Sequence, residues 1–85
     1  MAPLPALPHS PAMLKKRSVL LAGHATSVAL EPEFWTVLDA IAAERNLSKA
    51  GLLIWIDETR GRTPLASACR LLALDWARSQ PPPQA

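Results

Sequence analysis

Three consecutive basic residues, Lys15, Lys16 and Arg17, are the residues of this 85-residue chain whose types and spacing most directly suggest chemistry. A cluster of cations contacts the phosphate groups of nucleic acids, and the alternative interpretation is a solvated run that binds nothing. The formal net charge is +2 per chain, which is compatible with a nucleic-acid partner but does not require one.

Catalytic and metal-binding chemistry is not predicted, because the other reactive side chains lack partners at a useful spacing. Cys69 is the single cysteine, and on an apolar helix stripe it would pack as a small hydrophobe. His9 and His24 have no second ligand at a metal-binding spacing. Asp57 and Glu58 are adjacent on a predicted helix and therefore point in different directions. We expect no enzyme, no catalytic residue, no cofactor and no metal.

Proline-rich sequence at both ends divides the chain into three parts. We predict a disordered arm over residues 1–14, a folded domain over 15–79 and a disordered tail over 80–85, because closely spaced prolines favour extended, solvated backbone. A core of about 65 residues is near the lower limit for independent folding and usually needs a disulfide, a metal or a partner chain. Since the sequence offers neither of the first two, we predict a homodimer.

The sequence also predicts a cytoplasmic protein with no membrane partner. The apolar N-terminus has no basic region before it and is interrupted by prolines, unlike a secretory signal. No apolar run reaches the roughly 18 residues that a spanning helix needs.

Residues His24–Leu30 alternate in polarity with the period of a strand that buries one face. The preceding segment, residues 18–22, is apolar and could in principle pair with this strand, but Ala22-Gly23-His24 is a poor hairpin turn. We therefore predict a single N-terminal strand that pairs antiparallel with the same strand of a second molecule about a two-fold axis.

Three helices are predicted after the strand. The first starts at Pro32, where a missing N–H costs nothing, and stops near Asn46, a residue common in left-handed C-caps. Ser48 is a good N-cap for the second helix. Over residues 52–56 this second helix is apolar on nearly all sides, so we expect a partner chain to cover part of it.

The third helix is predicted to have Thr63 as its N-cap and Pro64 at its first position, and to end near residue 79. The predicted fold class is mainly α, with one N-terminal β-strand followed by three helices. No pattern indicates a second domain.

An ordered set of short motifs runs through residues 15–79. They are Lys16-Arg17-Ser18-Val19, Ala22-Gly23-His24, Thr26-Ser27-Val28, Leu30-Glu31-Pro32-Glu33-Phe34-Trp35, Ile41-Ala42-Ala43-Glu44-Arg45 and Leu47-Ser48. On these motifs the chain resembles the ribbon-helix-helix family, and more closely a bacterial subgroup of small proteins with this domain. The resemblance implies a strand paired across a homodimer, with a third C-terminal helix as an addition. It also suggests Met13 as the initiator, a hypothesis that N-terminal sequencing tests.

The resemblance further implies a DNA-binding regulator of transcription. In the family, the paired strands enter the major groove and the N-terminus of the second helix meets a phosphate. On this sequence the outward strand residues are Ala25, Ser27 and Ala29, and the phosphate contact falls on Leu47-Ser48-Lys49. The basic cluster at residues 15–17 is then an arm placed to contact the DNA backbone.

Two of the three outward residues depart from the usual base-reading types. Alanine touches a thymine methyl but cannot form a hydrogen bond, so direct readout would rest on Ser27. One interpretation is weakly sequence-specific DNA binding. The alternative is a dimeric protein-interaction module that has kept the scaffold, has weak or lost DNA readout, and binds another protein.

Overall fold

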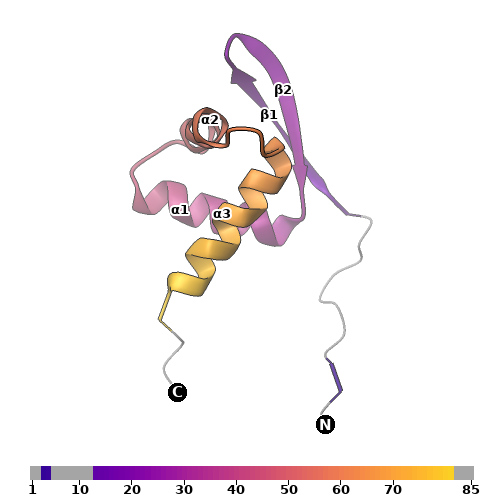
Figure 1. Ribbon diagram of the computed structural model, residues 1–85, viewed down its shortest axis with the longest axis vertical. Helices are drawn as coiled ribbons and strands as arrows, with labels where there is room; N and C mark the ends of the chain where they lie inside the picture. The colour runs from indigo at the N-terminus through magenta and orange to yellow at the C-terminus, as the bar shows by residue number, and fades with distance from the viewer. Residues whose placement is uncertain (1–2, 5–12, 82–85) are drawn as a thin grey trace.

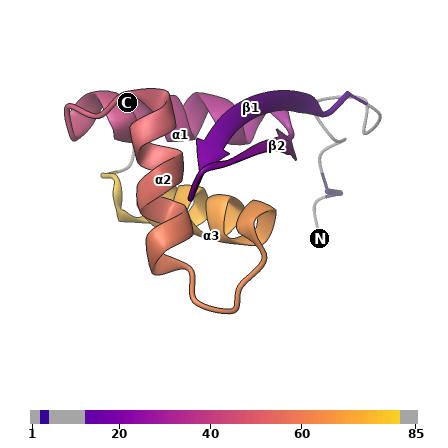
Figure 2. The same ribbon diagram turned by 90° about the horizontal axis from the view of Figure 1, so that it is seen from above.

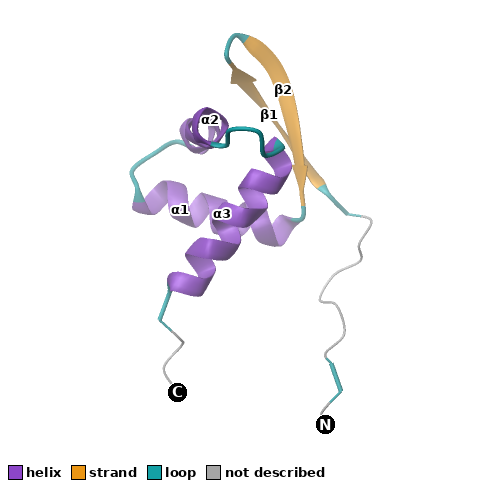
Figure 3. Ribbon diagram, viewed as in Figure 1, coloured by secondary structure: helices purple, strands orange, loops and turns teal. Residues whose placement is uncertain are grey.

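The computed structural model describes residues 3–4 and 13–81. A two-stranded sheet precedes three helices (Figures 1 and 3). The elements are β1 (Lys15–Leu21), β2 (His24–Leu30), α1 (Pro32–Glu44), α2 (Lys49–Thr59) and α3 (Leu65–Ser79). Most of the predicted N-terminal arm, including His9, and residues 82–85 of the predicted tail lie outside the described residues.

The main difference from the sequence prediction is at the N-terminal strand. The prediction of a single strand with no partner in its own chain is wrong, because β1 and β2 form an antiparallel hairpin within one chain. Pairing with a second molecule stays a prediction. The register runs from Lys15 opposite Leu30 to Leu21 opposite His24. The basic cluster therefore forms the start of β1 and is not a loose arm.

The hairpin turn consists of Ala22 and Gly23, which have φ angles of 50° and 82°. Positive φ at both central residues is what a type I′ turn requires, and this turn matches the twist of the flanking strands. Alanine adopts positive φ at a cost of about 1–2 kcal/mol. The residue types at this turn therefore do not predict a hairpin. Burial of one face of the hairpin against the helices offsets this cost.

Local sequence explains the start and end of α1. Pro32 occupies its first position, as predicted. Asn46, with φ of 57°, follows the C-cap Arg45, which confirms the predicted left-handed position. The Asn46 N–H donates to the Ala43 carbonyl and the Leu47 N–H to the Ala42 carbonyl, the two bonds of a Schellman motif.

The other two helices start differently from each other. Ser48 is the N-cap of α2, as predicted, and its hydroxyl accepts the Gly51 N–H at 2.9 Å. The predicted cap of α3 is wrong by one residue: the N-cap is Pro64, with an extended ψ of 145° and no side-chain cap. Thr63 instead closes the preceding loop, since its N–H donates to the Arg60 carbonyl and its carbonyl accepts from the Arg60 guanidinium.

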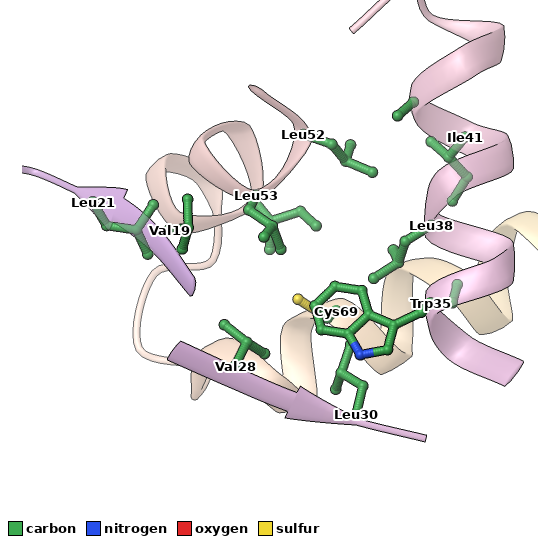
Figure 4. Close-up of a cluster of buried hydrophobic side chains, with 13 residues drawn as sticks. Val19, Leu21, Val28, Leu30, Trp35, Leu38, Ile41, Leu52, Leu53 and Cys69 are labelled. Carbon is green, nitrogen blue, oxygen red and sulfur yellow. The ribbon is translucent and has the colours of Figure 1, made fainter. Parts of the chain in front are cut away.

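One hydrophobic core joins the hairpin to all three helices (Figure 4). In this core α2 lies against β1 and α3 against β2, so the two helices cover the inner face of the hairpin (Figure 2). Trp35 of α1 is buried in this core, and its indole N–H donates to the Lys15 carbonyl at 2.8 Å. The buried residues are Val19, Leu21, Val28, Leu30, Trp35, Leu38, Ile41, Ala42, Leu52, Leu53, Ile56, Cys69 and Ala73.

Candidate nucleic-acid interface

The hairpin presents a face to solvent that is built from both strands. Alternation along each strand sends every second side chain away from the core. We call this the outer ribbon face, and its residues are Lys16, Ser18, Leu20, Ala25, Ser27 and Ala29. All are exposed except Ala29, which is half-buried. The end of the hairpin that carries the turn projects beyond the helices (Figure 1).

Residues opposite each other on the outer ribbon face are mostly small. Ser18 faces Ser27, Lys16 faces Ala29 and Leu20 faces Ala25. The three β2 residues of this face are among the predicted site residues, whereas Ser18 and Leu20 are not, because the sequence predicts no strand partner for residues 18–22. Their alternation with buried Val19 and Leu21 was the signal that would have placed them on a strand.

The three basic residues of β1 have different environments. Lys15 and Lys16 are exposed, whereas Arg17 is half-buried on the inner side of the hairpin. The Arg17 guanidinium donates to both carboxylate oxygens of Asp39 on α1, at 2.7 and 3.0 Å. It also stacks over the Trp35 ring, 4.4 Å from the ring centroid. The structure therefore places Arg17 against α1, while Lys16 points outward.

Asp39 links β1 to the start of α2. Its Oδ2 lies 3.6 Å from the Nζ of Lys49, whose side chain is 65% exposed. Hydrogen bonding from Arg17 is the main cause that lowers the pKa of Asp39 below its ordinary value, and the same bond raises the pKa of Arg17. Asp39 therefore lies between two cations, Arg17 of the basic cluster and Lys49 of the predicted phosphate contact at α2. Asp39 is not predicted from the sequence as a site residue, because Arg17 and Lys49 are distant from it in the chain.

The N-terminus of α2 retains the features of an anion site. The first helical N–H groups have no intrahelical acceptor, and the Ser48 hydroxyl satisfies the one from Gly51. Lys49 and Ala50 are both exposed beside this cap. Free N–H groups next to a lysine are suited to a phosphate. Leu47 is 41% exposed and lies instead at an apolar cleft.

This apolar cleft has a volume of about 150 Å³ and lies between the three helices. Trp55 and Trp76 line it together with Leu47, and the charged residues Arg45 and Asp75 also belong to its lining. The Trp76 indole N–H donates to Glu44 at 2.9 Å. The apolar side chains in this lining are suited to contact with an apolar group.

Other chemistry is limited in the part of the chain that the structure describes. No group of three potential metal ligands occurs among residues 3–4 and 13–81. None of the described helices is both long and apolar enough to cross a lipid bilayer. Cys69 is fully buried, and burial raises the pKa of its thiol to about 11, which makes it an inert packing residue.

Comparison with protein families matches residues 14–77, about three quarters of the chain, to the ribbon-helix-helix domain. No curated protein and no solved structure matches the chain significantly. The match confirms the resemblance to the ribbon-helix-helix family that was drawn from the sequence motifs, and the matched residues include both strands, α1, α2 and most of α3. The chain therefore belongs to the ribbon-helix-helix family, a family of DNA-binding, regulatory domains.

Proposed function

We propose that this protein is a homodimeric transcriptional regulator that binds DNA through the outer ribbon face and the N-terminus of α2. The observation that carries the proposal is that Asp39 ties β1 to the start of α2, since it contacts Arg17 at 2.7 Å and Lys49 at 3.6 Å. Arg17 itself lies on the inner side of the hairpin, and its neighbours Lys16 and Ser18 lie on the outer ribbon face. A two-stranded ribbon fits the major groove, which is about 12 Å wide. The α2 N-terminus then contacts the phosphate backbone beside the groove.

The exposed side chains of the proposed interface are better suited to contacts with phosphates than to hydrogen bonds with bases. Ser18 and Ser27 are the hydroxyl groups on the outer ribbon face, and Ala25 and Ala29 offer methyl contacts to thymine. Lys15, Lys16 and Lys49 are exposed and supply positive charge. We expect DNA binding that depends strongly on salt and discriminates weakly between sequences.

The test is a DNA titration at several salt concentrations with two variants, each of which removes one exposed positive charge. Lys49→Ala removes a predicted phosphate contact and should lower the slope of log K against log salt by about 1. Arg78→Ala removes an exposed charge from the last turn of α3 and is the control. Its slope should equal that of the wild type.

Two results would count against DNA binding at this face. One is the absence of binding to any duplex at low salt. The other is an equal loss of slope in Lys49→Ala and Arg78→Ala, which would mean that the protein attracts DNA only by its net charge.

The alternative function is a dimeric protein-interaction module, which also involves no catalysis. It is favoured by the apolar cleft and by the exposed side chains of Leu71 and Leu74 on α3, which are 59% and 50% accessible. A pull-down from the native host would support it if one protein bound at stoichiometric levels to the wild type and not to Trp55→Ala. Recovery of nucleic acid alone would contradict it.

A further inference from the structure

The apolar cleft between the three helices extends from the core to the surface. Ile41 and Leu52 are 2% and 3% exposed and belong to the core. Leu47 and Trp55 are 41% and 45% exposed, so the cleft is open to solvent on their side. The apolar residues of its lining are Ile41, Leu47, Leu52, Trp55, Leu72 and Trp76. Apolar and aromatic walls with a few polar groups are the usual composition of a small-molecule site.

Two charged side chains in the lining have no partner in the part of the chain that the structure describes. Arg17, Arg60 and Arg70 each donate to a carboxylate. Arg45 and Asp75 form no side-chain hydrogen bond or ion pair with each other or with any other described residue. Both are exposed. A cation and an anion are therefore available at one apolar cleft.

One wall of the cleft is held in place before any ligand arrives. Leu72 and Trp76 are four residues apart on α3 and therefore lie on the same face of the helix. The Trp76 indole N–H donates to Glu44 of α1 at 2.9 Å, which fixes the orientation of the ring. A ring that is already ordered loses little conformational entropy when a ligand packs against it.

The volume of the cleft limits the apolar part of a ligand to about one ring. The cleft measures about 150 Å³, and an apolar cavity of about this volume accommodates benzene. A guanidinium binds a carboxylate through parallel hydrogen bonds, and a carboxylate such as Asp75 accepts from an ammonium group. A ligand that uses all of these features has a ring-sized apolar group, a carboxylate and an ammonium.

We propose that the cleft binds a free aromatic amino acid of the size of phenylalanine. The ring packs against Trp55 and Trp76, since aromatic rings attract one another in offset and edge-to-face contacts. The α-carboxylate contacts Arg45, and the α-ammonium contacts Asp75. An internal residue of a peptide carries neither of these charges, so the site favours the free amino acid over a protein segment. This ligand site goes beyond the proposed DNA binding and does not depend on it.

Tryptophan fluorescence of the full chain tests the proposal, because Trp55 and Trp76 line the cleft and phenylalanine gives no signal under excitation selective for tryptophan. L-Phenylalanine should change the fluorescence saturably at neutral pH, and calorimetry should give the same dissociation constant. Two probes remove one charge each: 3-phenylpropionate lacks the ammonium and phenethylamine lacks the carboxylate. Each should bind about fivefold more weakly, the effect of one exposed ion pair. N-Acetylphenylalanine amide, which lacks both charges, should bind most weakly.

Three variants assign each charge of the ligand to a residue. Arg45→Gln should weaken binding of L-phenylalanine about fivefold and leave phenethylamine unchanged, because phenethylamine has no carboxylate to lose. Asp75→Asn should weaken L-phenylalanine about fivefold and leave 3-phenylpropionate unchanged. Arg62→Gln removes an exposed charge outside the cleft lining and is the matched control, which should bind every probe as the wild type does. All three side chains are exposed, so circular dichroism should show an unchanged fold.

Four results would overturn the inference. The first is the absence of a saturable response to L-phenylalanine. The second is equal binding of N-acetylphenylalanine amide, which would mean that the cleft takes a side chain of another protein. The third is loss of phenylalanine binding as the protein concentration rises, which would mean that a second copy covers the cleft. The fourth is an equal effect of Arg45→Gln and Arg62→Gln. The salt titration tests DNA binding independently of all four.

Discussion

At the residue scale, the environment of Arg17 separates it from its basic neighbours. Its charge is neutralised by Asp39 and its guanidinium covers Trp35, so it stabilises the packing of β1 on α1. Lys15 and Lys16 are exposed and remain available to a phosphate. The three basic residues, which look alike in the sequence, therefore lie in two different environments in the structure.

The Arg17–Asp39 pair makes the free energy of unfolding depend on pH in the acid range. The folded protein lowers the pKa of Asp39 below its ordinary value of 3.8, so the pair stabilises the fold fully above pH 3.8 and loses this effect as the pH falls through the folded pKa. Asp39→Asn should lower the free energy of unfolding by about 0.5–1 kcal/mol at pH 7, and the difference from wild type should shrink towards pH 3. Urea unfolding at several pH values measures this. The exposed Asp75→Asn is the control, and a difference from wild type that persists at pH 3 would contradict the assignment.

At the scale of elements, the hairpin depends on a turn that its own sequence disfavours. Ala22 has φ of 50°, whereas Gly23 meets the same requirement without strain. The hairpin forms because its inner face enters the core and because α2 and α3 each cover one strand. Tertiary packing therefore overrides the local preference at Ala22.

Relieving this strain should stabilise the protein. Ala22→Asn places a residue that tolerates positive φ in a type I′ turn and should raise the free energy of unfolding by about 0.5–1 kcal/mol. Gly23→Ala is the matched control and should lower the free energy of unfolding by about 1 kcal/mol, because an alanine is strained at a φ of 82°. No atom lies within 4 Å of the added Cβ, so the loss comes from the backbone and not from a clash. Chemical denaturation measures both changes. Equal effects of the two substitutions would show that the turn is not of this type.

At the scale of the whole molecule, α2 leaves apolar surface uncovered. Ile54 and Trp55 are 40% and 45% exposed, although the helix buries Leu52, Leu53 and Ile56. Leu20 on the outer ribbon face is 64% exposed. This surface supports the proposed homodimer, because a chain of this size gains little from exposing large apolar side chains.

A homodimer predicts that thermal stability depends on protein concentration. Raising the concentration about a hundredfold should increase the Tm by several degrees, since association stabilises the folded chain by mass action. Ile54→Glu should fold and lose the dependence if α2 forms part of the interface, whereas Ser67→Glu on the exposed side of α3 should retain it. A wild-type Tm that is constant with concentration would contradict the homodimer.

The sequence by itself determined the three helices, the Schellman motif at Asn46 and the Ser48 cap, because these depend on side-chain periodicity and on hydrogen bonds between near neighbours. It also carried enough motifs to indicate the family. Only the tertiary structure decided that β1 pairs with β2, because the turn is locally unfavourable and the stabilising contacts are with distant helices. It likewise decided the role of Arg17, whose partner Asp39 is 22 residues away in the chain and is brought within 2.7 Å by folding.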